Sequence, residues 1–252
     1  MRKIPLIFSG IVSLVILLVA CSKADTPATG GNVFTAVAAA FGAQIDLNNL
    51  ANYAAQTKPA YIVKDNTGNN PITNAKATLG RVLFYDKKLS IDNTISCASC
   101  HKQAFAFSDT ALISSGVAGG LTDRHSMRLV NERFGVEAKF FWDERAVSLE
   151  NQTTQPIADH KEMGFSGQTG RAGIAALLAK LQATDYYNEL FKFTYGDITV
   201  TEPRLQECLS QFIRSIQSFD AKYDIGRAQV NNDRQPFPNL TAQENTGKDL
   251  FL

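Results

Sequence analysis

The chain has 252 residues, and its 25 Lys and Arg side chains nearly balance its 24 Asp and Glu side chains. This balance gives no reason to expect nucleic acid or an anionic membrane surface as a partner. The length suits one large domain or two small ones. No segment alternates polar and apolar residues as a strand does, so we expect an all-α fold.

Residues 1–20 have the pattern of a signal peptide, in which Arg2 and Lys3 precede an apolar run. The run is short for a transmembrane helix. The tetrapeptide Leu18-Val19-Ala20-Cys21 resembles a bacterial lipobox, in which the cysteine becomes the lipid-modified first residue. We therefore expect a periplasmic protein with a lipid anchor at Cys21 and a flexible tether after it.

Helical spacing of apolar residues predicts most of the remaining elements. We assign residues 21–71 to the tether and an N-terminal helical segment, with one or two helices within 34–57 and a loop at 64–74. Further helices are expected at 75–85, 97–101, 124–134, 146–157, 174–181 and 203–219. Cys208 falls on the apolar stripe of the last of these, which is typical of a small core residue.

The motif Cys97-Ala98-Ser99-Cys100-His101 carries the clearest chemistry. Two thiols three positions apart, followed at once by an imidazole, can hold a haem through two thioether bonds and supply an axial iron ligand. A zinc site would need a second Cys/His pair, which His125 and His160 do not form. A redox dithiol would need a βαβ setting. We expect haem c attached to Cys97 and Cys100 with His101 on the iron; a redox dithiol or a chance match are the alternatives.

Several motifs follow one another in a single order along the chain. They are Leu79-Gly80-Arg81-Val82-Leu83-Phe84-Tyr85-Asp86, Leu89-Ser90, the Cys97–Cys100 motif with His101, Phe107-Ser108-Asp109, Phe141-Trp142-Asp143-Glu144-Arg145-Ala146 and Glu162-Met163-Gly164. This succession resembles the bacterial di-haem cytochrome c peroxidases and their relatives, the methylamine-utilisation di-haem oxidases. The resemblance implies a cytochrome c-like peroxidatic haem domain at 72–215 and the start of a second haem domain at 216–252.

The resemblance also implies roles for single residues. His101 would be the proximal ligand of the peroxidatic haem, and Glu162 the distal acid and base that moves a proton between the two peroxide oxygens. Gln152 matches a distal-pocket amide, and Trp142 matches the aromatic residue between the two haems. We expect Phe107 to pack against the haem edge. From the residues alone, Glu162 would be an exposed turn residue and Trp142 an ordinary core residue.

The chain departs from the family pattern at three places. Many members have Arg-Asn-Ala-Pro, with the Asn in a calcium site, where this chain has His125 in the Asn position, which argues against calcium. Glu144 stands where Gly is usual. Residues 240–251 resemble the first helix of the second haem domain, but the chain stops at Leu252 before a second haem motif. We interpret it as a truncated di-haem peroxidase carrying one haem of two; the alternative is a natural one-haem protein.

The expected function is reduction of hydrogen peroxide to water, with electrons from a small cytochrome c or copper protein. Two alternatives remain. A one-haem electron-transfer cytochrome would need a sixth iron ligand, for which Met127 and Met163 are available. A quinone-cofactor-maturing oxidase would need the second haem. The family resemblance also suggests a homodimer.

The resting state of the iron gives a first prediction. Members that block their resting iron use a loop histidine, and this chain has none between His101 and His125. We therefore expect an open, high-spin ferric iron in the protein as isolated, measured by absorption and EPR spectroscopy. A low-spin, six-coordinate spectrum would contradict this and point to His125, Met127 or His160 as the sixth ligand.

Overall fold

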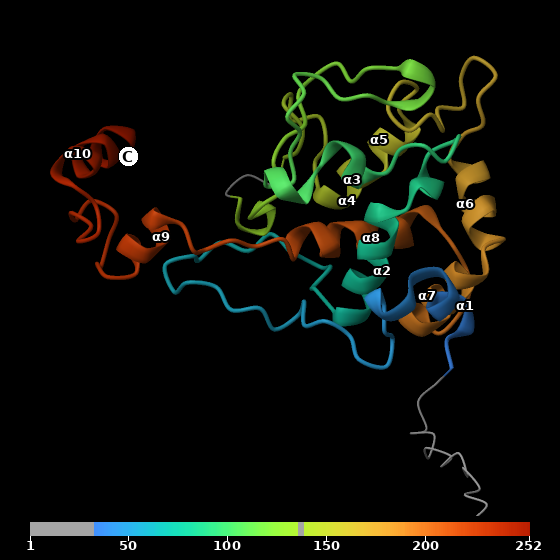
Figure 1. The fold of residues 1–252 in the computed structure, drawn as a ribbon, viewed down its shortest axis with the longest axis horizontal. Helices are drawn as coiled ribbons and strands as arrows, with labels where there is room; N and C mark the ends of the chain where they lie inside the picture. The colour runs from blue at the N-terminus through green and yellow to red at the C-terminus, as the bar shows by residue number, and fades with distance from the viewer. Residues whose placement is uncertain (1–32, 136–138) are drawn as a thin grey trace, which may run out of the picture. The chain divides into compact units, whose positions relative to one another are not determined.

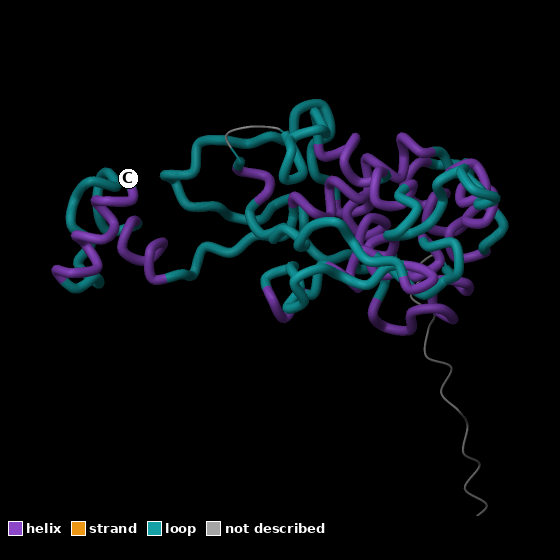
Figure 2. Tube along the Cα trace, turned by 90° about the horizontal axis from the view of Figure 1, so that it is seen from above, coloured by secondary structure: helices purple, strands orange, loops and turns teal. Residues whose placement is uncertain are grey.

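The computed structural model describes residues 33–135 and 139–252. The expected signal peptide, the lipidation site Cys21 and the tether before residue 33 lie outside the described residues. Within the described ranges the chain forms helices joined by loops, with isolated β-bridges and no strand, as Figure 2 shows. The all-α expectation is confirmed. No helix in this part of the chain is long and apolar enough to cross a membrane.

The described residues form ten α-helices and five short 3-10 helices (Figure 1). The α-helices are α1 (Thr35–Phe41), α2 (Asn74–Tyr85), α3 (Cys97–Cys100), α4 (Leu149–Thr153), α5 (Gln155–Ala158), α6 (Ile174–Gln182), α7 (Asp185–Tyr195), α8 (Glu202–Arg214), α9 (Lys222–Arg227) and α10 (Ala242–Phe251). The 3-10 helices are η1 (Gly42–Gln44), η2 (Lys87–Leu89), η3 (Gln103–Phe105), η4 (Val117–Gly119) and η5 (Glu132–Phe134).

Helices α2 and α8 pack against each other and carry much of the hydrophobic core. Each begins at a threonine cap: Thr73 Oγ1 accepts from the Lys76 amide at 3.2 Å, and Thr201 Oγ1 from the Arg204 amide at 3.4 Å. Their backbones meet at Gly80, where an added Cβ would lie 1.9 Å from the Cys208 carbonyl oxygen. The Cys208 side chain is fully buried, as predicted for a small core residue.

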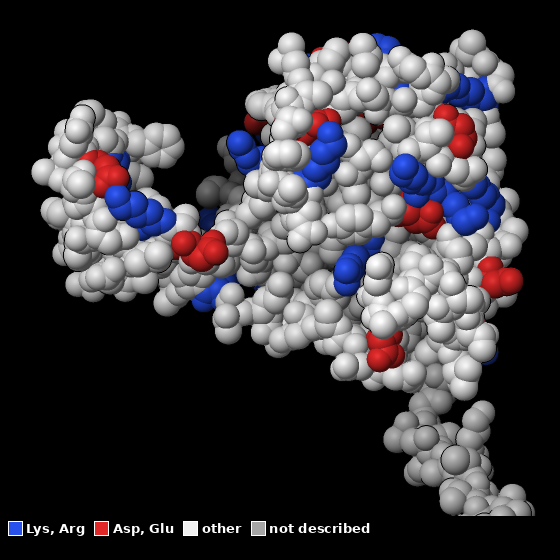
Figure 3. Space-filling model, in the orientation of Figure 1, with Lys and Arg blue, Asp and Glu red and all other residues white. Residues whose placement is uncertain are grey.

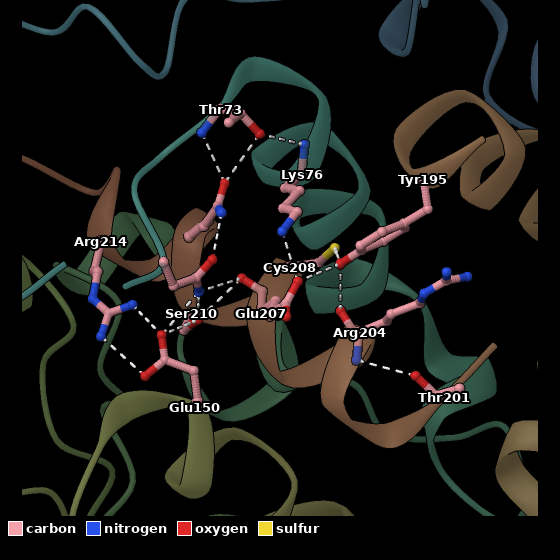
Figure 4. A network of polar contacts seen from close by, with 12 residues as sticks. Thr73, Lys76, Glu150, Tyr195, Thr201, Arg204, Glu207, Cys208, Ser210 and Arg214 are labelled. Carbon is pink, nitrogen blue, oxygen red and sulfur yellow. Dashed lines mark hydrogen bonds and ion pairs between the residues drawn. The ribbon is translucent and has the colours of Figure 1, made fainter. Parts of the chain in front are cut away.

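A polar network fixes the predicted loop at 64–74 to α4 and α8 (Figure 4). Glu150 accepts hydrogen bonds from Asn70 Nδ2 at 2.9 Å and Ser210 Oγ at 3.0 Å, and it pairs with the buried Arg214 guanidinium. Burial acts to raise the pKa of Glu150, but the bonds from Arg214 and Asn70 prevail and lower it to about 2. The charged pair therefore stays ionised at neutral pH and joins three segments far apart in sequence.

One expected helix was wrong, and one observed helix was not expected. Residues 124–134 contain only η5, because the backbone bonds outside its own segment: the Ser126 carbonyl accepts from Ser108 Oγ at 2.6 Å, and the Asn131 amide donates to the Ile216 carbonyl at 2.9 Å. Asn131 also has a positive φ of 64°, which ends any helix there. Helix α7 was not predicted, although its buried Tyr187, Leu190 and Phe191 have helical spacing.

The contact at Gly80 predicts a large effect of a single methyl group. Gly80→Ala should lower the free energy of unfolding by about 1–3 kcal/mol or more, because the Cβ would overlap the Cys208 carbonyl. Chemical denaturation of the haem-loaded protein measures this change. Gly247→Ala in α10 is the matched control: its Cβ would meet nothing within 4 Å, so helix propensity should stabilise it by about 0.5–1 kcal/mol. Equal effects of the two substitutions would contradict the close contact.

Candidate functional site

A cavity of about 480 Å³ lies between the Cys97–Cys100 helix α3, the loop at 122–129, the aromatic insert at 139–145, α4, the turn at 159–163 and α8. This volume is in the range of about 300–1,000 Å³ usual for small-molecule and cofactor sites. Six of the residues selected from sequence line it: Cys97, Cys100, His101, Trp142, Gln152 and Glu162. The structure thus brings together residues separated by up to 65 positions in the sequence.

The thiols and the imidazole lie on one helical turn. Ser96 and Ser99 cap it reciprocally, with the Ser96 amide donating to Ser99 Oγ at 3.0 Å. The ring of His101 hydrogen-bonds through Nδ1 to the Phe107 carbonyl at 2.9 Å, so Nδ1 carries the proton. Burial lowers the pKa of His101, which keeps the ring neutral. Nε2 is therefore left with its lone pair for a metal.

Phe107 contributes to the site through its backbone carbonyl. Its ring is not among the residues that line the cavity; it packs against Phe84, with ring centroids 6.0 Å apart. Its φ of 56° lies in the left-handed region, and this turn directs its carbonyl to His101. The expected contact between this ring and a haem edge stays a prediction, and the carbonyl role has no sequence signal.

Asp109 holds the loop that follows His101, a role with no signal in the sequence. Its carboxylate accepts from Lys102 Nζ at 2.6 Å and from Ser114 Oγ at 2.7 Å, with two backbone amides beside them. Burial acts to raise the pKa of Asp109, but these hydrogen bonds hold it well below its usual range. The loop also fixes His125, whose Nδ1 bonds to the Ala111 carbonyl at 2.9 Å and whose Nε2 contacts Ser108 Oγ at 3.2 Å.

Glu162 occupies a tight turn that begins at Asp159. The Glu162 amide donates to Asp159 Oδ1 at 3.0 Å, and the turn closes at Gly164 with a φ of 88°. The carboxyl group is half-buried, and no described residue hydrogen-bonds to it. Burial, helped by the charge of Asp159, raises the pKa of Glu162 to about 7. This is the proton affinity expected of a group that both takes and gives a proton near neutral pH.

The Gly-rich loop at 114–120 positions Glu162 through the backbone. A Cβ on Gly116 would lie 1.9 Å from the Lys161 carbonyl oxygen, so only glycine allows this approach. The next residue, Val117, donates its amide to the Glu162 carbonyl at 3.0 Å. The loop therefore fixes the main chain that carries the carboxyl group.

The aromatic insert forms a small closed loop at the cavity. Phe140 and Ala146 exchange backbone hydrogen bonds of 2.9 and 3.4 Å. Trp142 is 58% exposed, so its interpretation as an ordinary core residue is wrong, and its Nε1 donates to the His125 carbonyl at 2.9 Å. Glu144 has a φ of 55°, a conformation that favours glycine.

The residues considered as a sixth iron ligand are placed differently. His125, Met127 and Met163 line the cavity, whereas His160 is not among its lining residues and bonds to Ser166 Oγ at 2.9 Å. Gln152 also lines the cavity, and its side chain has no hydrogen-bond partner among the described residues.

These observations test whether the residues fit a covalent haem. The two thiols share one turn, His101 bonds through Nδ1 to the Phe107 carbonyl, and the adjoining cavity has the volume of a cofactor site. A carboxyl group with a pKa near neutrality lines the same cavity. The donor set and the space fit haem c.

Comparisons with known proteins agree with this chemistry. The profile of the family described as "Di-haem cytochrome c peroxidase" matches residues 74–232. The methylamine utilization protein MauG of Methylophilus methylotrophus is 31% identical over 156 residues, which are 62% of this chain and 44% of that protein. Cytochrome c551 peroxidase of Nitrosomonas europaea is 30% identical over 148 residues, or 59% of this chain and 42% of that protein. The chain therefore spans less than half the length of these relatives.

A solved structure has a similar fold. A MauG-like protein associated with microbial copper homeostasis aligns with a TM-score of 0.60 and 31% identity, covering 77% of this chain and 53% of that one.

The environment of Asp109 predicts a pH-dependent stability. Because its pKa is lower in the folded chain than its unfolded value of about 4, its contribution is complete above that pH and is lost on further acidification. Asp109→Asn should lower the free energy of unfolding at neutral pH by about 1–3 kcal/mol. The loss relative to wild type should shrink as the pH falls below 4, as measured by urea denaturation.

Asp123→Asn is the matched control for Asp109→Asn, because Asp123 also pairs with a lysine, Lys161, but is exposed. Its effect should be much smaller than that of Asp109→Asn, because an exposed ion pair contributes little to stability. A similar loss in both variants would mean that Asp109 does not hold the loop.

Proposed function

The chain belongs to the di-haem cytochrome c peroxidase family, and on this basis we propose that it is a haem c peroxidase that reduces hydrogen peroxide to water. The observation that supports the proposal most is the position of Glu162: a carboxyl group with a pKa of about 7 lines the same cavity as Cys97, Cys100 and His101. The fold and the family show that the chain belongs with the di-haem cytochrome c peroxidases. The reduction of hydrogen peroxide is what we infer.

His101 and its loop would hold the cofactor. Haem c, when bound through Cys97 and Cys100, supplies the iron at which peroxide is reduced. The hydrogen bond from His101 Nδ1 to the Phe107 carbonyl fixes the orientation of the ring and increases the basicity of Nε2, the atom that would ligate the iron. Asp109 keeps the loop that contains Phe107 closed.

Glu162 would move the protons. Its carboxylate takes a proton from one peroxide oxygen and returns it to the other, which becomes the leaving water. No described side chain competes for the carboxylate, so it is free to bond to peroxide. The unpartnered amide of Gln152 lines the same cavity and would donate to peroxide.

Electron supply belongs to the same proposal. Trp142 lies on the cavity wall with its indole anchored to the His125 carbonyl, and we assign it to electron passage toward a second haem. A small cytochrome c or a copper protein would be the electron donor. The protein would be a homodimer, anchored to a periplasmic membrane surface through Cys21.

On the face seen in Figure 3, Lys and Arg side chains are interspersed with Asp and Glu side chains. A donor docking on that face would meet both signs of charge.

A quinone-cofactor-maturing oxidase is the second candidate. It is supported by the similarity to MauG, 31% identity over 156 residues, against 30% over 148 residues for the peroxidase of Nitrosomonas europaea. Turnover of peroxide with a small redox protein distinguishes the two, since the oxidase would instead withdraw electrons from a protein substrate.

The assigned role of Glu162 predicts a loss of reaction with peroxide without loss of haem. Glu162→Gln should slow the reaction by about 100- to 10,000-fold, the usual contribution of a general acid or base. In wild type the rate should rise with pH through about 7, as the carboxyl group becomes the base, and this limb should vanish in the variant. Stopped-flow spectroscopy of the Soret band measures both.

The matched control is Glu132→Gln, the same change at a second carboxyl group that lines the cavity and whose pKa burial also raises. Unchanged kinetics in Glu162→Gln would refute the role of Glu162. An equal loss in both variants would show that the effect is not specific to it.

A further inference from the structure

Two adjacent tyrosines of α7 share one carboxylate oxygen. Tyr186 Oη donates to Asp86 Oδ2 at 2.6 Å, and Tyr187 Oη donates to the same atom at 2.9 Å. Their ring centroids are 4.7 Å apart, with the rings tilted by 44°. Asp86 ends α2, and its other oxygen accepts from the Lys88 amide at 2.8 Å, which fixes the carboxylate between the two helices. Neither tyrosine has a role in the function proposed above.

The two phenols differ in burial and in their neighbours. Tyr187 is completely buried, and its pKa is raised well above the usual value, first by burial and then by nearby groups that include Asp86 and Cys97. Tyr187 belongs to the hydrophobic core against which the Cys97 side chain packs, and Cys97 is the expected site of haem attachment. Tyr186 is only half-buried and packs edge-on against Phe41 at 5.1 Å. The pair extends from the neighbourhood of the attached haem toward solvent.

A purely structural role explains less of this arrangement. One hydroxyl group would suffice to tie α7 to Asp86, and the core around Tyr187 is formed by apolar side chains such as Leu181, Leu190 and Phe191. A phenylalanine would fill the same space without burying a hydroxyl group. Two neighbouring phenols on a common proton acceptor are, in contrast, suited to one-electron oxidation, because a phenol gives up an electron readily when a base takes its proton.

We propose that Tyr187, Tyr186 and Asp86 form a redox relay that reduces the peroxide-oxidised haem when no protein donor is bound. The proposal rests on the proposed function, which supplies the oxidised haem. Tyr187 gives one electron to the haem, and its O–H bond breaks as the proton passes to Asp86 Oδ2. The products are a neutral tyrosyl radical, a haem reduced by one electron and a protonated Asp86.

The second step moves the radical outward. Tyr186 gives one electron to the Tyr187 radical; Asp86 returns its proton to Tyr187 and takes the proton of Tyr186 in its place. A small one-electron reductant, such as ascorbate, then reduces the Tyr186 radical, which recovers its proton from Asp86. One electron has passed from the reductant to the haem, and all three side chains end unchanged.

EPR spectroscopy of the haem-loaded protein, frozen after mixing with peroxide in the absence of a donor, tests the relay. We expect a radical signal in wild type that narrows when the protein contains ring-deuterated tyrosine. Tyr187→Phe should reduce the signal to background and speed haem bleaching by excess peroxide several-fold. Tyr186→Phe should keep the signal but slow its quenching by ascorbate several-fold. Tyr61→Phe is the matched control, since Tyr61 also donates to a carboxylate, Asp224 Oδ1, at 2.8 Å but is not part of the hydrophobic core that contains Tyr187 and contacts Cys97; it should leave both readouts unchanged.

A second measurement keeps the test independent of the folding of Tyr187→Phe. Fluorotyrosine placed at position 187 of the Tyr186→Phe variant retains the hydrogen bond to Asp86, and the radical, which then cannot move to position 186, should show splitting by fluorine. A Soret change with peroxide but no tyrosyl radical, or a signal without fluorine splitting, would overturn the relay and leave the peroxidase proposal standing. Failure of the haem to react with peroxide would remove the oxidant and overturn both.

Discussion

The close approach of α2 and α8 at Gly80 is the contact on which the geometry of the site depends. Because a Cβ at Gly80 would lie 1.9 Å from the Cys208 carbonyl, the two backbones can meet there only without a side chain. Beyond this contact α2 leads through Asp86 to the segment that carries Cys97, while α8 contributes Leu209 and Ile213 to the cavity wall. The crossing therefore sets how far the haem-attachment turn lies from the opposite wall.

A second close contact, between loops, links the two sides of the chemistry. Gly116 lies directly on the Lys161 carbonyl, and Val117 bonds to the Glu162 carbonyl, so the loop that starts beyond His101 also encloses the distal turn. The same enclosure that fixes Glu162 removes water from it, and burial is the main cause of its raised pKa. The contacts of this loop thus account both for the position of Glu162 and for its raised pKa.

The sequence was informative where chemistry or periodicity is local. The spacing within Cys97–Cys100 and His101, the stripes of α2 and α8 and the burial of Cys208 depend on neighbours in sequence, and the structure agrees with them. Residues 124–134 were misjudged because their backbone groups bond to distant partners such as Ser108 and Ile216. The Phe107 carbonyl and the anchoring carboxylate of Asp109 were not identifiable, since such roles arise only from tertiary folding.

The most direct measurement is a crystal structure of the haem-loaded protein with the iron located by anomalous scattering. An iron atom inside the cavity, bonded to His101 Nε2 and with the Glu162 carboxyl group on the opposite face of the haem, is the expected result. An iron atom outside the cavity, or Glu162 turned away from the haem face opposite His101, would contradict the assignment of this cavity as a peroxidatic site.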